Sequence, residues 1–244
     1  MLHQTNTLER KMKFSQGNRK LQKLAMEKGH KKAHIVSFDL PAGHTCPGAK
    51  DCLSKVDRHG AKPIQDGPHT KFRCYAASAE AFYKNTRLMR WNNLDAVRIA
   101  LRKGVVHCAS EISQVLPKHA KIVRIHTSGD FFSVKYMQAW IMVCKLHPEV
   151  EFYGYTKSLK VLQKVGKLPA NFHLTLSHGG KFDASIPTFG LPVAHVVSSE
   201  LVALTRGLKV DTTDAIACSS NKNDFALVIH GVQPKGGHKL AYSV

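Results

Sequence analysis

The chain has 244 residues, 43% of them hydrophobic, and a formal net charge of +19. This length accommodates one large domain or two small ones, and the hydrophobic content is sufficient for a folded core. No apolar run is long enough to cross a membrane, and the N-terminus lacks the apolar stretch of a secretory signal. We therefore expect a cytoplasmic protein whose six cysteines are metal ligands or buried thiols, not disulfides.

The basic composition favours a polyanionic partner, most often nucleic acid. A solubilising basic surface explains the same charge equally well. Lysine and arginine are concentrated in residues 1–32, where Glu9 and Glu27 are the acidic residues. We predict a basic arm or a peripheral helix for residues 1–32, and a single α/β domain for residues 33–244.

Short apolar runs alternate with helical patterns along the remaining chain. Apolar residues recur at helical spacing over residues 76–103, which places Arg87 and Arg90 on the opposite, solvated side. Further helices are predicted over 105–116, 134–146 and 159–166. The runs rich in branched residues predict strands at 34–38, 121–126, 151–155, 172–176, 194–198 and 225–229.

The order of strand, polar tip and helix is typical of parallel βα units. Six such strands are too few for a complete eight-stranded barrel, so the predicted fold is an incomplete TIM-like barrel or an open parallel sheet. Ligands of parallel α/β proteins bind where the strands end. No GxGxxG or Walker pattern follows a strand, which argues against dinucleotide and P-loop sites.

A cysteine loop is expected over residues 43–77, between the first strand and the first helix of the domain. It carries Cys46, Cys52 and Cys74, separated by five and then twenty-one residues. Three thiolates favour an iron–sulfur cluster or zinc, and on a [4Fe–4S] cluster they leave one iron open to a ligand. Three thiols without a metal are the alternative. Cys218 is a candidate fourth ligand.

Polar residues follow several of the predicted strands, at the edge where a ligand is expected. As catalytic groups for proton transfer and anion binding we predict His126, Asp130, Lys157 and His178. As substrate-binding groups we predict Ser128, Gly129, Ser177, Gly179, Gly180 and His230. Helix caps, a solvated lysine and a simple glycine turn are the structural alternatives for these residues.

Several segments together resemble the Gene product 88 family of phage and bacterial proteins, over about residues 36–234. They are Leu40–Pro47, Cys74–Ala76, Arg124–Phe131, Tyr155–Leu159 and Ile229–Gly231. The resemblance implies a phage-encoded protein of the host cytoplasm whose clustered cysteines bind iron–sulfur. Radical S-adenosylmethionine enzymes also use three cysteines, but these lie much closer together than in this chain. S-adenosylmethionine is therefore only a second candidate cofactor.

Two functions of different classes follow. The first is an iron–sulfur enzyme, a lyase or a radical-type enzyme, that binds a phosphate- or oxygen-rich small substrate at an open iron. The second is a basic nucleic-acid-binding phage protein with a structural metal site. A zinc hydrolase is a weaker third option. The sequence contains no signal for the oligomeric state.

Overall fold

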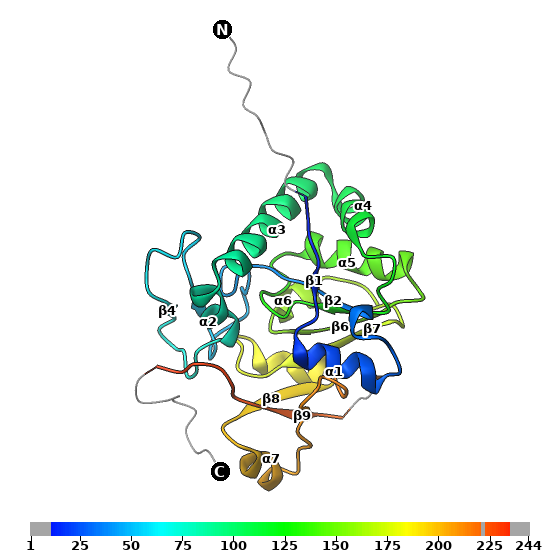
Figure 1. Ribbon diagram of the computed structural model, residues 1–244. Helices are drawn as coiled ribbons and strands as arrows, with labels where there is room; N and C mark the ends of the chain where they lie inside the picture. Colours follow the sequence, from blue (N-terminus) through cyan, green and yellow to red (C-terminus); the bar gives the residue numbers. More distant parts are fainter. Residues whose placement is uncertain (1–10, 221–222, 235–244) are drawn as a thin grey trace.

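The computed structural model describes residues 11–220 and 223–234, which form an α/β fold and confirm the predicted class (Figure 1). Its main element is a seven-stranded sheet in the order β1-β2-β5-β6-β7-β8-β9. β1 is antiparallel to β2, and every other pair is parallel. The strands are β1 Ser15–Gln16, β2 Ile35–Phe38, β5 Ile122–Ile125, β6 Glu151–Thr156, β7 Phe172–Ser177, β8 Val193–Val197 and β9 Phe225–Val228.

Helices connect most of the parallel strands, as the alternating sequence pattern predicts. The region expected to be one helix over 76–103 is divided in two at Tyr83, whose extended backbone separates α2 from α3. The helices are α1 Arg19–Glu27, α2 Tyr75–Phe82, α3 Lys84–Lys103, α4 Val105–Val115, α5 Val134–Leu146, α6 Leu159–Leu162 and α7 Glu200–Thr205. Two short 3₁₀ helices, η1 Lys32–His34 and η2 Asp183–Thr188, complete the described helical segments.

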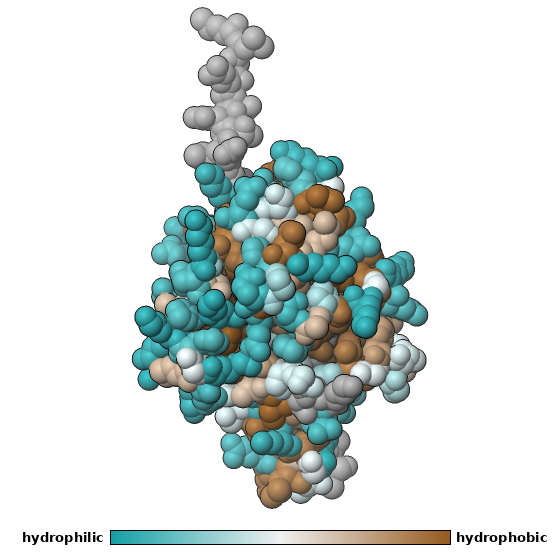
Figure 2. Space-filling view, turned by 90° about the vertical axis from the view of Figure 1, so that its right-hand side faces the viewer, coloured by the Kyte–Doolittle hydropathy of each residue, from teal (hydrophilic) through white to brown (hydrophobic). Residues whose placement is uncertain are grey.

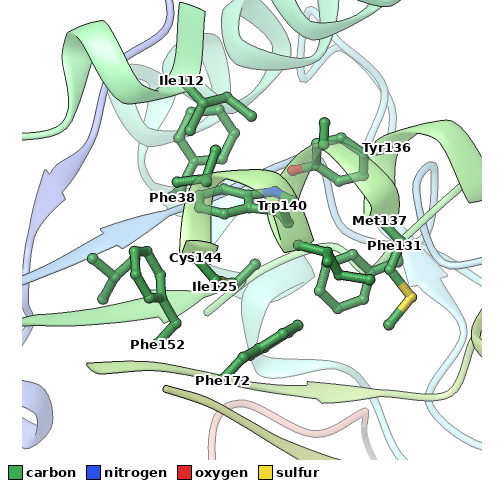
Figure 3. Close-up of a cluster of buried hydrophobic side chains, with 14 of the residues drawn as sticks. Phe38, Ile112, Ile125, Phe131, Tyr136, Met137, Trp140, Cys144, Phe152 and Phe172 are labelled. Atoms are coloured by element: carbon green, nitrogen blue, oxygen red, sulfur yellow. The ribbon is translucent and has the colours of Figure 1, made fainter. Parts of the chain in front are cut away.

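One face of the sheet packs against α3, α4 and α5 and forms the larger core. Trp140 of α5 is fully buried, and its ring meets Phe38 of β2 and Phe152 of β6 edge-on at 5.4 and 6.5 Å between centroids (Figure 3). Side chains alternate along each strand, so Val123 and Ile125 of β5 join this core as neighbours of the β2 residues. The buried aromatic rings fix the sheet against the helices.

The other face of the sheet is covered at its strand-start end by α1. Leu21, Leu24 and Ala25 of α1 are buried in a second cluster that includes Ile35 and Tyr153 of the sheet. Residues 11–32 thus contain β1 and a helix packed on the sheet, which corresponds to the peripheral-helix alternative. Residues 1–10 lie outside the described part of the chain. The first turn of α1, with Lys20 and Leu21, borders the cavity beyond the carboxyl ends of the strands.

Two local features, one in the helices and one in the cysteine loop, differ from the sequence-based expectation. Arg87 and Arg90 are both about 95% buried, not solvated, because they donate to the backbone and carboxylate of the buried Glu80. The turn-rich part of the cysteine loop contains a small hairpin of β3 Ser54–Lys55 and β4 Gln65–Asp66. Both features arise from contacts between separate elements. The spacing of apolar residues within one segment does not predict such contacts.

The outer surface is mostly hydrophilic on the face shown in Figure 2, with hydrophobic side chains gathered at its lower end. That end is where Figure 1 places α7, whose Leu201 and Leu204 are 68% and 74% exposed. Within the described residues, no helix is long and apolar enough to span a membrane.

Candidate metal centre and strand-end pocket

The carboxyl ends of the parallel strands surround a cavity of about 420 Å³. Cys46, Cys52 and Cys74 all line it, on the side formed by the cysteine loop. None of the three is in a disulfide. Most of the residues predicted from strand ends line it as well, namely His126, Ser128, Gly129, Asp130, Lys157, Ser177 and His230.

The cysteine loop is held against the strand tips by backbone contacts. The N–H of Asp51 donates to the carbonyl of Gly179 at 2.9 Å, and the N–H of Lys181 donates to the carbonyl of Gly48 at 2.8 Å. Gly48 is required here because a Cβ at this position would overlap the carbonyl oxygen of Lys157. The tips of β6 and β7 therefore set the position of Cys46 and Cys52.

Cys74 is held by a different element, because it is the residue directly before α2. At this helix N-terminus the backbone N–H groups of Ala76 and Ala77 favour the thiolate and lower the pKa of Cys74, although burial outweighs them. The buried Glu80 anchors α2 by accepting from the N–H of Ala42 at 2.9 Å and from the Ser128 hydroxyl at 3.1 Å. This carboxylate thus joins the start of the cysteine loop, α2 and the tip after β5.

The three thiols lie close enough to influence one another. Burial and, to a smaller extent, the neighbouring Cys52 together raise the pKa of Cys74 to about 11. Burial, then Asp130, Cys74 and Cys52, raise the pKa of Cys46 well above its usual range. The pKa of Cys52 is also raised by burial, although the Lys157 ammonium opposes this shift. Without a bound cation, the site therefore keeps its thiols protonated at neutral pH.

Lys157 is a buried cation that lines the same cavity and acts electrostatically on Cys52. Its ammonium donates to the Ser177 hydroxyl and to the carbonyl of His178, the latter at 2.8 Å. Within the described part of the chain, it forms no ion pair with a carboxylate. A buried charge is costly unless it is compensated, so an uncompensated ammonium favours an anionic occupant of the pocket.

His126 and Asp130 occupy the tip after β5 in different roles. His126 has a positive φ of 68°, and its Nε2 lies 2.9 Å from the Tyr136 hydroxyl, while Nδ1 is buried and has no hydrogen-bond partner among the described residues. Burial, helped by Arg124, lowers the pKa of His126 to about 3, so the ring is neutral. Asp130 accepts from the Thr156 hydroxyl and from backbone N–H groups, which makes it a residue that holds the strand tips together.

His230 and Ser128 also line the pocket, and each contacts another residue of the site. The His230 ring lies 4.6 Å from the Tyr75 ring, and burial lowers its pKa. The Tyr75 hydroxyl donates to the carbonyl of Thr127, so this pair connects α2 with the tip after β5. The Ser128 hydroxyl donates its hydrogen bond to the carboxylate of Glu80.

The segment from His178 to Gly180 is placed differently from the prediction. The ring of His178 is outside the pocket, stacked on His195 at 5.4 Å between centroids. The N–H groups of Gly179 and Gly180 donate to the carboxylate of Asp183, so they are not available to an anionic ligand. The carbonyl of Gly179 supports the cysteine loop by accepting from the N–H of Asp51.

The far end of the pocket contains a charged cluster that the sequence-based analysis missed. Arg124 of β5 forms an ion pair with Asp214, which also pairs with Lys20 of α1 at 2.6 Å. The guanidinium lies over the rings of Tyr153 and Tyr155, at 5.1 and 4.3 Å from their centroids. Burial disfavours the Asp214 charge, but Arg124 and Lys20 outweigh it and lower its pKa. The sequence does contain a signal for this cluster, because Arg124 interrupts an otherwise apolar strand.

Cys218 is remote from the three pocket thiols. It is fully buried, and its sulfur lies 3.8 Å from a carboxylate oxygen of Glu151, the first residue of β6. The pocket lies beyond the other ends of the parallel strands, and Cys218 does not line it. It is therefore not positioned as a fourth ligand.

The fold and the pocket together define a class of protein: an α/β protein with a thiol-lined cavity at the carboxyl ends of its parallel strands. The sequence model of the family described as Gene product 88 matches residues 12–242. The chain belongs to this family, as its motifs predicted.

Two curated relatives come from mycobacterial phages. The Gene 88 proteins of Mycobacterium phages L5 and D29 are each 30% identical over 129 residues, covering 50% of this chain and 47% of the relative. The chain thus spans about half the length of the curated relatives it matches. No solved structure gives a significant match.

Proposed function

We propose that this chain is an iron–sulfur enzyme in which Cys46, Cys52 and Cys74 bind a [4Fe–4S] cluster with one open iron. The observation that carries the proposal is the convergence on one cavity of three partly buried thiols and the Lys157 ammonium, which has no carboxylate partner among the described residues. Thiolates are the usual ligands of such clusters. The positive charge of Lys157 would offset the negative charge that the bound thiolates bring into the pocket.

The spread of the thiols bears on which metal fits. Within the described residues, no three His, Cys, Asp or Glu side chains converge closely enough to hold a single metal ion. A four-iron cluster makes a different demand, because each thiolate binds a different iron and the sulfurs stand farther apart. The absence of such a converging group from the described residues counts against one zinc ion held by the three cysteines.

The remaining pocket residues would serve a small substrate rich in phosphate or other oxygen atoms. When bound, the cluster would supply a Lewis-acidic iron or an electron. Lys157 would bind an anionic oxygen, and the buried Nδ1 of His126 would form a hydrogen bond with the ligand. Lyase chemistry and radical chemistry with S-adenosylmethionine remain alternatives within this proposal.

The proposed site would lie at the open end of an incomplete barrel. β2 and β5 to β9 are parallel and follow one another in sequence order, which is the order of strands in a βα barrel. Within the main sheet, β1 and β9 occupy the two edges. In this arrangement the thiols sit where barrel enzymes place their ligands.

Substitution of one thiol tests the proposal. Anaerobically purified protein should be brown and contain about four irons and four sulfides per chain. Cys74→Ser should lose most of that iron because only two thiolates remain. Cys218→Ala is the matched control, since it removes a buried cysteine distant from the pocket and should keep the iron. A colourless protein with one zinc per chain, or unchanged iron in Cys74→Ser, would refute the cluster.

A further inference from the structure

A second cavity, larger and more open, lies between the N-terminal segment and α3. It has a volume of about 1060 Å³ and is lined mainly by basic and amide side chains. We call it the basic groove and define it by Lys11, Lys13, Gln16, Arg58, Asn85 and Asn92. The N-terminal segment, dark blue in Figure 1, passes α3 before it reaches the sheet.

Alternation along the N-terminal segment places its lysines in the basic groove. Met12 is buried, and the Phe14 ring packs against Phe38 at 5.2 Å, so these two side chains anchor the segment to the core. Lys11 and Lys13 point the opposite way, as expected for an extended chain, and are exposed. Asn93 of α3 fixes the register, because it accepts from the N–H of Lys13 at 2.8 Å and donates to its carbonyl.

The basic groove has an excess of positive charge. Among the described residues, neither Lys11 nor Lys13 forms an ion pair, whereas Arg58 pairs with Asp95 at 2.7 Å. The acidic residue in the lining is Asp39, whose carboxylate accepts from the Ser37 and Thr127 hydroxyls and from backbone N–H groups. Asp39 is therefore saturated with hydrogen bonds, and the lysines are left to bind an anion.

We propose that the basic groove binds the backbone of a single-stranded nucleic acid. Lys11 and Lys13 are two residues apart on an extended segment, so their Cα atoms are about 7 Å apart. This spacing is comparable to that of successive phosphates along an extended strand. The amides of Gln16 and Asn85 can form hydrogen bonds with unpaired bases, whereas the Asn92 amide donates to the carbonyl of Lys11 at 3.0 Å. The net charge of +19 would further attract such a polyanion.

The basic groove also borders the cysteine pocket. Asn18 and Thr127 line both cavities, so a strand in the basic groove has a nucleotide next to the entrance of the pocket. The substrate of the proposed iron–sulfur site would then be a nucleotide residue within a single strand. This second step rests on the proposed function, whereas binding in the basic groove does not.

Fluorescence anisotropy with a labelled single-stranded oligonucleotide tests the binding step. Lys11→Gln/Lys13→Gln should weaken binding at least tenfold at low salt. It should also lower the magnitude of the log K against log salt slope by about 1.4, since about 0.7 is expected for each lost phosphate contact on a single strand. Lys164→Gln/Lys167→Gln removes the same charge from an exposed segment away from the groove. This control should change the affinity and the salt dependence only slightly.

Three results would overturn the binding step. They are no binding at low salt, equal losses in the two double variants, and equal competition by a duplex of the same sequence. The iron content of each variant is measured on the same samples. If iron is absent while the oligonucleotide still binds through Lys11 and Lys13, the cluster proposal fails and the groove proposal stands.

Spin resonance of the reduced protein tests the substrate step. An oligonucleotide bound in the basic groove should alter the cluster signal of the wild-type protein and leave that of Lys11→Gln/Lys13→Gln unchanged at the same concentration. Binding without any change in the signal would refute the nucleotide as the substrate while leaving the groove assignment intact.

Discussion

His126 has the most unusual local structure among the predicted site residues. It is buried and adopts a positive φ that residues other than glycine rarely adopt, and within residues 11–220 and 223–234 one of its ring nitrogens has no hydrogen-bond partner. Strain and an unsatisfied polar atom each cost free energy, and together they are characteristic of sites that bind a ligand. Contacts in the surrounding core offset this free-energy cost, because Phe131 packs against the ring and Tyr136 forms a hydrogen bond with it.

The neutral state of His126 gives a prediction for the pH dependence of stability. Its pKa is about 3 in the folded protein and about 6.5 in the unfolded chain, so below pH 6.5 only the unfolded state takes up the proton. The free energy of unfolding should therefore fall as the pH drops from 6.5 towards 3, by up to about 1.4 kcal/mol per pH unit.

His126→Asn isolates this contribution, because asparagine is uncharged and tolerates a positive φ. The stability advantage of the wild type over this variant should shrink by about 2 kcal/mol between pH 7 and pH 5. Urea unfolding at the two pH values measures it. Parallel pH profiles of the two proteins would show that His126 is not held neutral by burial.

At the scale of elements, the cysteine loop depends on its close approach to β6. Gly48→Ala should destabilise the protein by about 1–3 kcal/mol, because the new methyl group overlaps the carbonyl of Lys157 and moves the loop. The variant should also bind less iron, since Cys46 would move with the loop. Gly166→Ala, where a Cβ meets nothing within 4 Å, should change stability by less than about 1 kcal/mol. Equal effects of the two substitutions on urea unfolding would contradict this view of the loop.

The positions of the strands and helices show how much of the fold could be predicted from the sequence. The apolar strands were predictable within one or two residues, because the patterns of buried β5 to β9 and of α5 are local. The three cysteines line one cavity at the strand ends, as their position in the loop after β2 led us to expect, and their role as metal ligands stays a prediction. The β3–β4 hairpin was missed because its strands are two residues long and have no apolar periodicity.

Other parts of the site depend on contacts that no local pattern carries. Glu80 looks like an ordinary charged helix residue in the sequence, yet it is fully buried and joins α2, α3 and the cysteine loop. His178 was predicted to face the ligand because it follows a strand, but β7 ends at Ser177 and the chain then turns so that the ring lies on His195. Asp214 meets Arg124 from a distant loop.

At the scale of the whole molecule, both faces of the sheet contribute to the stability of the fold. Trp140 lies in the core on one face, and α1 packs through Leu24 on the other. We expect tryptophan fluorescence and far-UV circular dichroism to report one coincident transition in urea. A separate early transition, abolished by deleting residues 1–32, would show that the N-terminal region folds independently.

The order of the strands has a consequence for how the protein folds. From β5 to β9, each parallel strand pairs with its nearest neighbour in sequence, whereas residues 39–121 separate β2 from its partner β5. Closing this long connection costs more entropy than closing the short ones, so we expect β5 to β9 to assemble first and β2 to join later. The first strand of the parallel series to leave the ribosome would then be among the last to be placed. The segment that carries all three pocket thiols lies within that connection, so it would settle onto strand tips that are already formed.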